Sequence, residues 1–243
     1  MLGLLQVDDI TLLEKDLTEL RKHLIADPYF AGVPSMQPET RKTAVGFHAK
    51  DDLPEVRREV FAVLSKHKDL NFFAIIRDKY QLLSYVLQRN AIDPTYRYNS
   101  NELYDYLVRR LFRDRLHTRD SYRIYFSRRG SSDRTQAFNF ALNAAKERFA
   151  EKHPQAEKIS EVEIEVIPAY SIDIAALQAV DYFLWSLQRL YERGEDRFIS
   201  LLWPSFRLVI DMDDTRFAGY GTYYNRKKPL NLDAIKERSV GRK

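Results

Sequence analysis

Three side chains in this sequence have types and neighbours that suit the binding of a divalent cation. Asp78 directly follows the apolar run Asn71–Arg77, and the carboxyl ends of strands in open α/β sheets face the binding crevice. Asp181 is a lone acid in the apolar segment 177–185, where an unpaired buried carboxylate would be costly. His48 lies at the end of a short strand-like segment. Each residue also has an ordinary meaning: Asp78 could cap the next helix, Asp181 could face a crevice or an arginine, and His48 could be structural.

Basic residues beside these positions could contact an anion. The turn 128–134 (RRGSSDR) holds three arginines and two serine hydroxyls where a helix is expected to begin. Guanidinium groups and free N–H groups converge at such a turn, although a solvated basic loop is equally consistent with the pattern. The candidates for nucleic-acid contact are Lys50, Lys79, Arg128, Arg129 and Arg134.

The C-terminal part of the chain holds two further polar groups. Asp211, Asp213 and Asp214 follow the expected strand Phe206–Ile210 and could bind a cation, but turn and capping roles are commoner. An aromatic and basic patch follows, which could stack bases and hold phosphates, although packed tails are more often built this way. The patch comprises Tyr220, Tyr223, Tyr224, Arg226, Lys227 and Lys228.

Alternating strand and helix patterns predict the elements that position these residues. Strands and helices of this spacing are typical of an α/β fold with a partly parallel sheet flanked by helices. Strands are expected at 2–7, 44–49, 71–77, 122–126, 162–167 and 206–210. Helices are expected at 10–26, 54–67, 80–88, 101–116, 133–149, 174–192 and 198–202, within a single domain 1–243 whose residues 211–243 form a C-terminal extension.

Composition excludes several classes of chemistry. The 243 residues include no Cys, which rules out disulfides, Cys-ligated zinc and a Cys nucleophile. No phosphate-binding glycine loop or Gly-x-Ser-x-Gly elbow is present. The start of the chain is unlike a signal peptide, and no apolar stretch approaches the roughly 20 residues that span a bilayer, so we expect a cytoplasmic protein without a membrane partner. The net charge of +4 permits an anionic partner without requiring one.

Three motifs together resemble a bacterial family, domain of unknown function 3800. They are FHAKDD at 47–52, RDK at 77–79 and LQAVDYF at 177–183, and the last is similar to the family's Leu-Gln-x-Ala-Asp-Tyr pattern, with Val180 in place of Ala. The resemblance spans Leu2 to about Arg207. It implies an RNase H-like fold, metal-dependent nuclease activity with Mg²⁺ or Mn²⁺, and a role with mobile elements or phage defence.

The resemblance assigns residues only in part. Asp181 and Asp78 would be metal ligands and catalytic, with His48 beside them. The family's first strand carries an acidic motif, whereas Met1 here already falls in what resembles the second strand. An acid often follows the strand at 122–126 in the family, and Ser127 and Arg128 stand there instead. Because two-metal chemistry needs several carboxylates, we expect an impaired nuclease in this form: either the chain lacks its natural start, or the protein is a degenerate, non-cleaving relative.

Two functions follow from the sequence. The first is an RNase H-like protein that acts on nucleic acid. The alternative is a non-catalytic scaffold on the same fold, which would bind a partner protein or a second copy of the chain. Salt dependence separates them, because phosphate contacts weaken steeply with salt and apolar interfaces do not.

Overall fold

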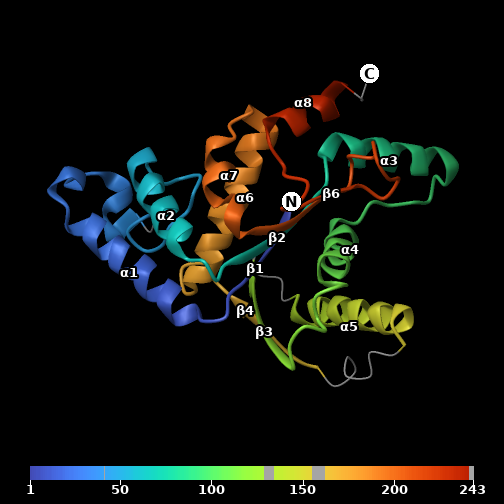
Figure 1. Ribbon diagram of the computed structural model, residues 1–243, viewed down its shortest axis with the longest axis horizontal. Helices are drawn as coiled ribbons and strands as arrows, with labels where there is room; N and C mark the ends of the chain where they lie inside the picture. The colour runs from blue at the N-terminus through green and yellow to red at the C-terminus, as the bar shows by residue number, and fades with distance from the viewer. Residues whose placement is uncertain (41, 129–133, 155–161, 241–243) are drawn as a thin grey trace.

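The computed structural model describes residues 1–40, 42–128, 134–154 and 162–240, and they form an α/β fold with two sheets (Figure 1). The larger sheet has the order β1–β2–β5–β6, in which β2 and β5 are parallel and the outer pairs are antiparallel. In the smaller sheet β3 runs parallel to β4. The expected mixed, partly parallel sheet is confirmed. The strands are β1 (Leu2–Gln6), β2 (Asn71–Ile76), β3 (Ser121–Ser127), β4 (Glu163–Ala169), β5 (Phe206–Asp211) and β6 (Thr222–Tyr224).

Helices cover the larger sheet on both faces, as the spacing of apolar residues predicts. The chain also makes short 3₁₀ turns in the loop after the first helix and before β5. None of the helices in the described part of the chain is long and apolar enough to cross a membrane. The helices are α1 (Ile10–Ala26), α2 (Pro54–Lys66), α3 (Lys79–Ile92), α4 (Ser100–Phe112), α5 (Thr135–Lys152), α6 (Ala175–Arg193), α7 (Arg197–Leu202) and α8 (Leu232–Val240).

Strand β2 is buried on both faces, which its uninterrupted apolar sequence predicts. Phe72, Ala74 and Ile76 belong to a core cluster with residues of α1, α2, α6 and α7. Ile75 points the other way, into a second cluster formed by α4, α5, β3 and Ile210 of β5. Because successive side chains of a strand face opposite sides, one central strand supports both cores and fixes α4 and α5 against the sheet.

The prediction of a strand at 44–49 is wrong. These residues form turns, and two of their backbone N–H groups donate to side chains of α6 rather than to a neighbouring strand. The Phe47 N–H donates to Gln178 Oε1 at 2.9 Å, and the Ala49 N–H donates to Asp181 Oδ2 at 2.8 Å. Since buried backbone groups need a partner of some kind, an apolar segment can be held without joining a sheet.

The end of the described chain adds two elements where no regular structure was expected. Strand β6 pairs with β5, with Val209 opposite Tyr224, and Leu230 is buried in the first core cluster. Helix α8 then carries Arg238 back to the end of β5, where its side chain is 7% exposed. The segment that follows Asp211 therefore completes one edge of the sheet and covers part of its end.

Candidate functional site

Two of the residues selected from the sequence lie side by side. His48 Nδ1 is 3.7 Å from Asp181 Oδ2, and the same carboxylate oxygen accepts the Ala49 N–H. Both residues line a groove of about 1470 Å³ between the facing strands β1 and β3, and Arg128 and Arg134 line it as well. Four of the predicted site residues, from three different parts of the chain, thus line one groove.

The arginines of that groove are already engaged. Arg134 donates to Asp105 Oδ1 at 2.5 Å and to Asn101, and its guanidinium lies over the Tyr104 ring at 5.0 Å. It therefore clamps the start of α5 to α4. Arg128 stacks on Tyr170 at 5.2 Å.

The other predicted nucleic-acid contacts are dispersed. Lys50 and Lys79 are exposed, and neither is among the residues that line the groove. Arg129, with most of the predicted anion-binding turn 128–134, lies outside the described residues. The sequence-based phosphate site is therefore not assembled in the part of the chain that the structure describes.

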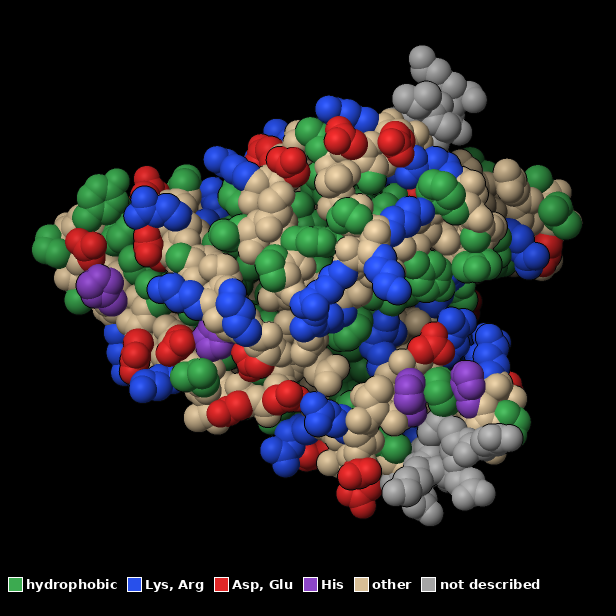
Figure 2. Space-filling view, in the orientation of Figure 1, with side chains coloured by type: hydrophobic (Ala, Val, Ile, Leu, Met, Phe, Trp, Pro, Cys, Tyr) green, Lys and Arg blue, Asp and Glu red, His purple; other side chains and the backbone are tan. Residues whose placement is uncertain are grey.

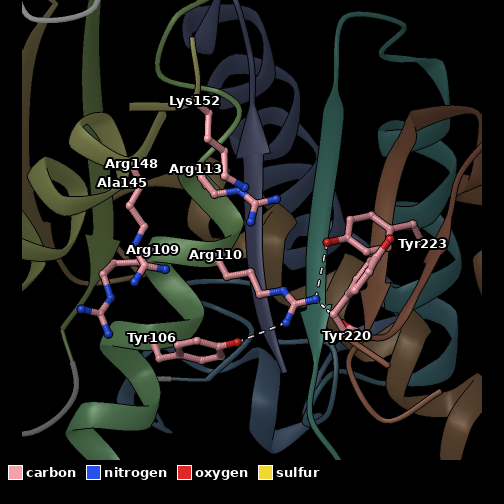
Figure 3. A pocket seen from close by; sticks show the side chains of 9 residues that line it. All are labelled: Tyr106, Arg109, Arg110, Arg113, Ala145, Arg148, Lys152, Tyr220 and Tyr223. Atoms are coloured by element: carbon pink, nitrogen blue, oxygen red, sulfur yellow. Dashed lines mark hydrogen bonds between the residues drawn. The ribbon is translucent and has the colours of Figure 1, made fainter. Parts of the chain in front are cut away.

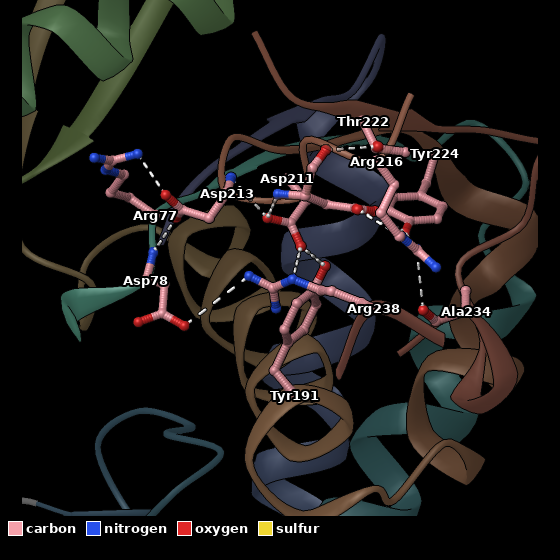
Figure 4. Close-up of polar contacts among 11 residues, drawn as sticks. Arg77, Asp78, Tyr191, Asp211, Asp213, Arg216, Thr222, Tyr224, Ala234 and Arg238 are labelled. Carbon is pink, nitrogen blue, oxygen red and sulfur yellow. Dashed lines mark hydrogen bonds and ion pairs between the residues drawn. The ribbon is translucent and has the colours of Figure 1, made fainter. Parts of the chain in front are cut away.

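Asp78 has the ordinary role that the sequence offered as its alternative. Its Oδ1 accepts the N–H groups of Tyr80 at 2.8 Å and Gln81 at 3.4 Å, which caps α3. Its own N–H donates to Asp213 Oδ2 at 2.5 Å, and its Oδ2 is 4.0 Å from Arg238 (Figure 4). Asp78 thus joins a set of charged residues at the ends of the parallel strands β2 and β5.

This set, which we name the carboxylate network, pairs acids with arginines (Figure 4). Asp211 is fully buried, with its Oδ2 3.1 Å from Arg238 Nε and 2.9 Å from the Tyr191 hydroxyl. Burial raises the pKa of Asp211, although Arg238 opposes this. Its Oδ1 also accepts two backbone N–H groups of the following turn, so the turn role is confirmed. The network comprises Arg77, Asp78, Asp211, Asp213, Asp214, Arg216 and Arg238.

Asp214, in the same network, has a lowered pKa, whereas that of Asp211 is raised. Burial alone would raise its pKa, but hydrogen bonds from Arg216 and from the Tyr224 hydroxyl outweigh burial and lower the pKa well below its ordinary value. Arg216 Nε lies 2.7 Å from Asp214 Oδ1, and the Tyr224 hydroxyl lies 2.6 Å from Oδ2. The arginine and the tyrosine therefore hold Asp214 in its charged form.

The residues present do not form a metal centre around Asp78 and Asp181. Asp181 lines the groove beside His48, whereas Asp78 caps α3 and belongs to the carboxylate network. Across the described residues, no group of three or more His, Asp or Glu side chains could hold a metal ion. Binding of Mg²⁺ or Mn²⁺ stays a prediction, and we derive no chemical step from it.

A second hollow, which we name the basic cleft, has the charge of an anion site (Figure 3). Its volume is about 670 Å³, and none of the described residues that line it is Asp or Glu. In Figure 2, Lys and Arg side chains gather on the right of the face, around the hollow above α5. The lining residues are Tyr106, Arg109, Arg110, Arg113, Ala145, Arg148, Lys152, Tyr220 and Tyr223.

Helical spacing explains how α4 and α5 present these cations together. Tyr106, Arg109, Arg110 and Arg113 lie at positions i, i+3, i+4 and i+7 of α4, so they share one face. The remaining face of α4 is buried against the sheet through residues such as Leu111. Helix α5 packs against α4 and adds Ala145, Arg148 and Lys152 at the same kind of spacing.

The cations of the basic cleft differ in how far they are already paired. Arg109 and Arg148 make no hydrogen bond or ion pair with any described residue. Arg113 forms an ion pair with Asp114, with Nη2 3.0 Å from Oδ2, and this hydrogen bond raises the pKa of Arg113. Arg110 donates to the Tyr106 hydroxyl at 3.1 Å and to the Tyr220 carbonyl.

The tyrosine side of the cleft depends on a turn at Gly221, at the end of the loop that joins β5 to β6. Gly221 has φ +106°, and a Cβ there would lie 2.5 Å from the Asp211 carbonyl oxygen. Only glycine tolerates both the conformation and the close approach. The turn places Tyr220 and Tyr223 beside Arg110, with their ring centroids 6.1 Å apart and their planes at 76°.

Comparison with family models, with curated proteins and with solved structures finds no match to this chain. The functional conclusion therefore depends on the geometry of the molecule itself.

Sequence reasoning did not identify the basic cleft. The sequence does indicate Tyr220 and Tyr223 as candidates, but the basic residues expected beside them lie elsewhere. Arg226 donates to the Pro204 carbonyl, and Lys228 lies over the Phe217 ring. One signal was present in the sequence, namely the shared face of α4 that carries three arginines. Its partners on α5 and in the β5–β6 turn are remote in sequence and become visible only in the fold.

Proposed function

We propose that this chain binds nucleic acid and holds the phosphate backbone in the basic cleft. One observation carries the proposal: four arginines and a lysine converge from two helices, with no carboxylate among the described lining residues. Phosphate contacts from Arg and Lys release condensed counterions and supply most of the sequence-independent affinity for nucleic acid. The arrangement suits a polyanion better than a single small anion, because the cations are spread along two helices.

Arg109 and Arg148 support the proposal because they make no ion pair with a described residue. A phosphate can contact these two guanidinium groups without first displacing a carboxylate of the part of the chain that the structure describes. Arg110 is instead fixed by its contacts with Tyr106 and Tyr220. A guanidinium fork that is already oriented loses less conformational entropy on binding. Arg109, which has no described partner, and Arg110, which is held in place, are thus neighbours on α4.

The same proposal covers the RNase H-like assignment and a role with mobile elements or phage defence. The mixed sheet flanked by helices supports the first, and the second stays a prediction from the family resemblance. Metal-dependent cleavage stays a prediction outside this proposal, since Asp78 and Asp181 make separate sets of contacts.

Salt-dependent binding tests the proposal. Fluorescently labelled single-stranded and duplex DNA and RNA oligonucleotides are titrated with the protein at several salt concentrations, followed by anisotropy. We expect the logarithm of the association constant to fall linearly with the logarithm of salt concentration. The double variant Arg109→Glu, Arg148→Glu should weaken binding by about 10-fold or more, because two phosphate contacts are lost.

A charge-matched control separates the cleft from the overall charge. Lys15→Glu with Lys22→Glu makes the same change in net charge on α1, which Figure 1 places at the other end of the molecule. The control should bind like the wild type. Equal loss in both double variants would refute the cleft as the site. Absence of binding to every oligonucleotide would refute the function and favour the scaffold alternative.

A further inference from the structure

The two sides of the basic cleft differ in chemistry. Figure 3 shows Tyr220 and Tyr223 on one side and Arg109 and Arg148 on the other, with Arg110 between them. A polyanion alone would need only the cationic side. The tyrosine side therefore calls for a ligand that carries flat apolar groups as well as phosphates.

Tyr220 is the side chain best placed to contact such a group. Its side chain is 65% exposed, and its hydroxyl makes no hydrogen bond with any described residue. Its backbone carbonyl is nevertheless held by Arg110, and its ring meets Tyr223 edge-on. Tyr223 is half-buried and packs against the second core cluster. The ring of Tyr220 is thus presented to solvent from an ordered base.

Arg110 holds the backbone beside the exposed ring of Tyr220. Arg110 Nη2 contacts both the Tyr220 carbonyl and, at 3.4 Å, the Tyr223 hydroxyl. Burial by itself lowers the pKa of Arg110, but its hydrogen bonds to Tyr106 and Tyr223 outweigh burial and raise the pKa. A charged guanidinium therefore contacts the backbone of the residue that carries the exposed ring.

The exposed ring of Tyr220 favours a single-stranded nucleic acid over a duplex. Aromatic side chains bind single strands by stacking on unpaired bases. A duplex keeps its base faces within the stack and offers the protein mainly phosphates and groove edges. The cleft volume of about 670 Å³ falls within the usual range of sites for small molecules, about 300–1,000 Å³, so it suits one or two unstacked nucleotides.

We infer that the basic cleft selects single-stranded nucleic acid, with one base stacked on Tyr220 and the adjoining phosphates held by Arg110, Arg109 and Arg148. This inference depends on the proposed nucleic-acid binding. It adds that the ligand is single-stranded and that Tyr220 contacts its base. The stacked base carries no sequence preference, because every base has a flat face.

The test compares three probes that carry the same number of phosphates: a single-stranded 12-mer of mixed sequence, a 12-mer of abasic residues, and a hairpin duplex. Each is titrated with the full chain and with Tyr220→Ala, Tyr220→Phe and Tyr80→Ala. Tyr80 is another exposed tyrosine, on α3, and is 82% exposed. Thermal unfolding of each variant establishes that it is folded.

The wild type should bind the single strand about 10-fold more tightly than the abasic probe or the duplex. Tyr220→Ala should lose that advantage and keep the same salt slope, because no phosphate contact is removed. Tyr220→Phe should retain the advantage, since the ring is what stacks. Tyr80→Ala should behave as the wild type.

The possible failures are distinguishable. Salt-dependent binding that is equal for the single strand, the abasic probe and the duplex would overturn the inference and leave the proposed function standing. Retained single-strand preference in Tyr220→Ala would likewise overturn it. Loss of all binding by the wild-type chain, or binding insensitive to salt, would overturn both the inference and the proposed function.

Discussion

The carboxylate network and the basic cleft use the same kinds of residue for opposite purposes. In the network, each of Arg77, Arg216 and Arg238 lies within ion-pair distance of an aspartate, and Asp211 and Asp214 are fully buried. In the cleft, Arg109 and Arg148 lack an internal partner among the described residues. Both sites lie beside the segment that joins β5 to β6. Their position along the sheet therefore does not explain why the arginines are paired in one site and unpaired in the other.

The comparison teaches that pairing, rather than residue type, separates a structural charge from one available to a ligand. A buried ion that loses its partner is strongly destabilising. An exposed cation without a partner costs little, because water solvates it. We therefore expect mutations in the network to change stability and mutations in the cleft to change binding. Changes at Asp211, at Asp214 and at the arginines of the cleft test this separation, and Asp181, outside both regions, gives an intermediate reference.

The largest effect on stability is expected from Asp211→Ala. This change removes the closest ion-pair partner of Arg238 and leaves a buried guanidinium with Asp78, 4.0 Å away, as its remaining aspartate neighbour. The free energy of unfolding should fall by about 3–5 kcal/mol, measured by denaturant titration. Asp233→Ala, at an exposed acid of α8, is the control and should cause no measurable change. A stable Asp211→Ala protein would show that the network does not support the fold.

The pH dependence of stability should identify the contribution of Asp214. Its pKa is lowered in the folded protein, so its stabilisation is complete above the unfolded pKa of about 4 and is lost as the pH falls further. The wild type should therefore lose stability relative to Asp214→Asn on acidification, by at most about 1.4 kcal/mol per pH unit. Chemical denaturation of both proteins between pH 3 and pH 7 measures this difference. Parallel curves would contradict a charged, stabilising Asp214.

A smaller effect is expected at Asp181. Removing its carboxylate in Asp181→Ala leaves the buried Ala49 N–H without an acceptor, which should cost about 1–3 kcal/mol. Asp181→Asn keeps an acceptor and should recover most of the loss in unfolding experiments. If both variants are equally unstable, the charge beside His48 matters more than the hydrogen bond.

The smallest effect on stability is expected in the cleft. The double variant Arg109→Ala, Arg148→Ala should unfold within about 0.5 kcal/mol of the wild type, yet its salt slope for single-stranded oligonucleotides should decrease by about 1.4. Denaturant titration and anisotropy on the same preparations give both values. A large loss of stability would erase the contrast between the two regions.

Much of the fold could be predicted because the apolar spacing is regular and local. Helix α1 begins and ends at the expected residues, and β2 has the burial on both faces that its sequence indicates. The prediction for 44–49 was wrong because its N–H groups at Phe47 and Ala49 donate to side chains of α6, which are more than 120 positions away in the sequence. Helix α8 gave little periodic signal. Its placement depends on contacts with remote segments: Leu232 and Ile235 pack against the first core cluster, and Arg238 lies beside Asp211.

The candidate sites were less predictable, because a site depends on which segments meet. His48 and Asp181 were chosen for their local neighbours and do meet. Asp78 was chosen by the same reasoning and instead caps a helix. The basic cleft needs two helices and a turn to converge, and neither charge counts nor short motifs carry that information.

The turn at Gly221 has a consequence for sequence variation. A side chain at this position would collide with the Asp211 carbonyl oxygen, although Gly221 is not among the residues that line the cleft. In a saturation library selected for nucleic-acid binding, we expect position 221 to retain glycine, while Arg109 and Arg148 exchange with lysine. The least replaceable residue of the cleft would then be one that never touches the ligand, and a search for functional positions by tolerance alone would misread it.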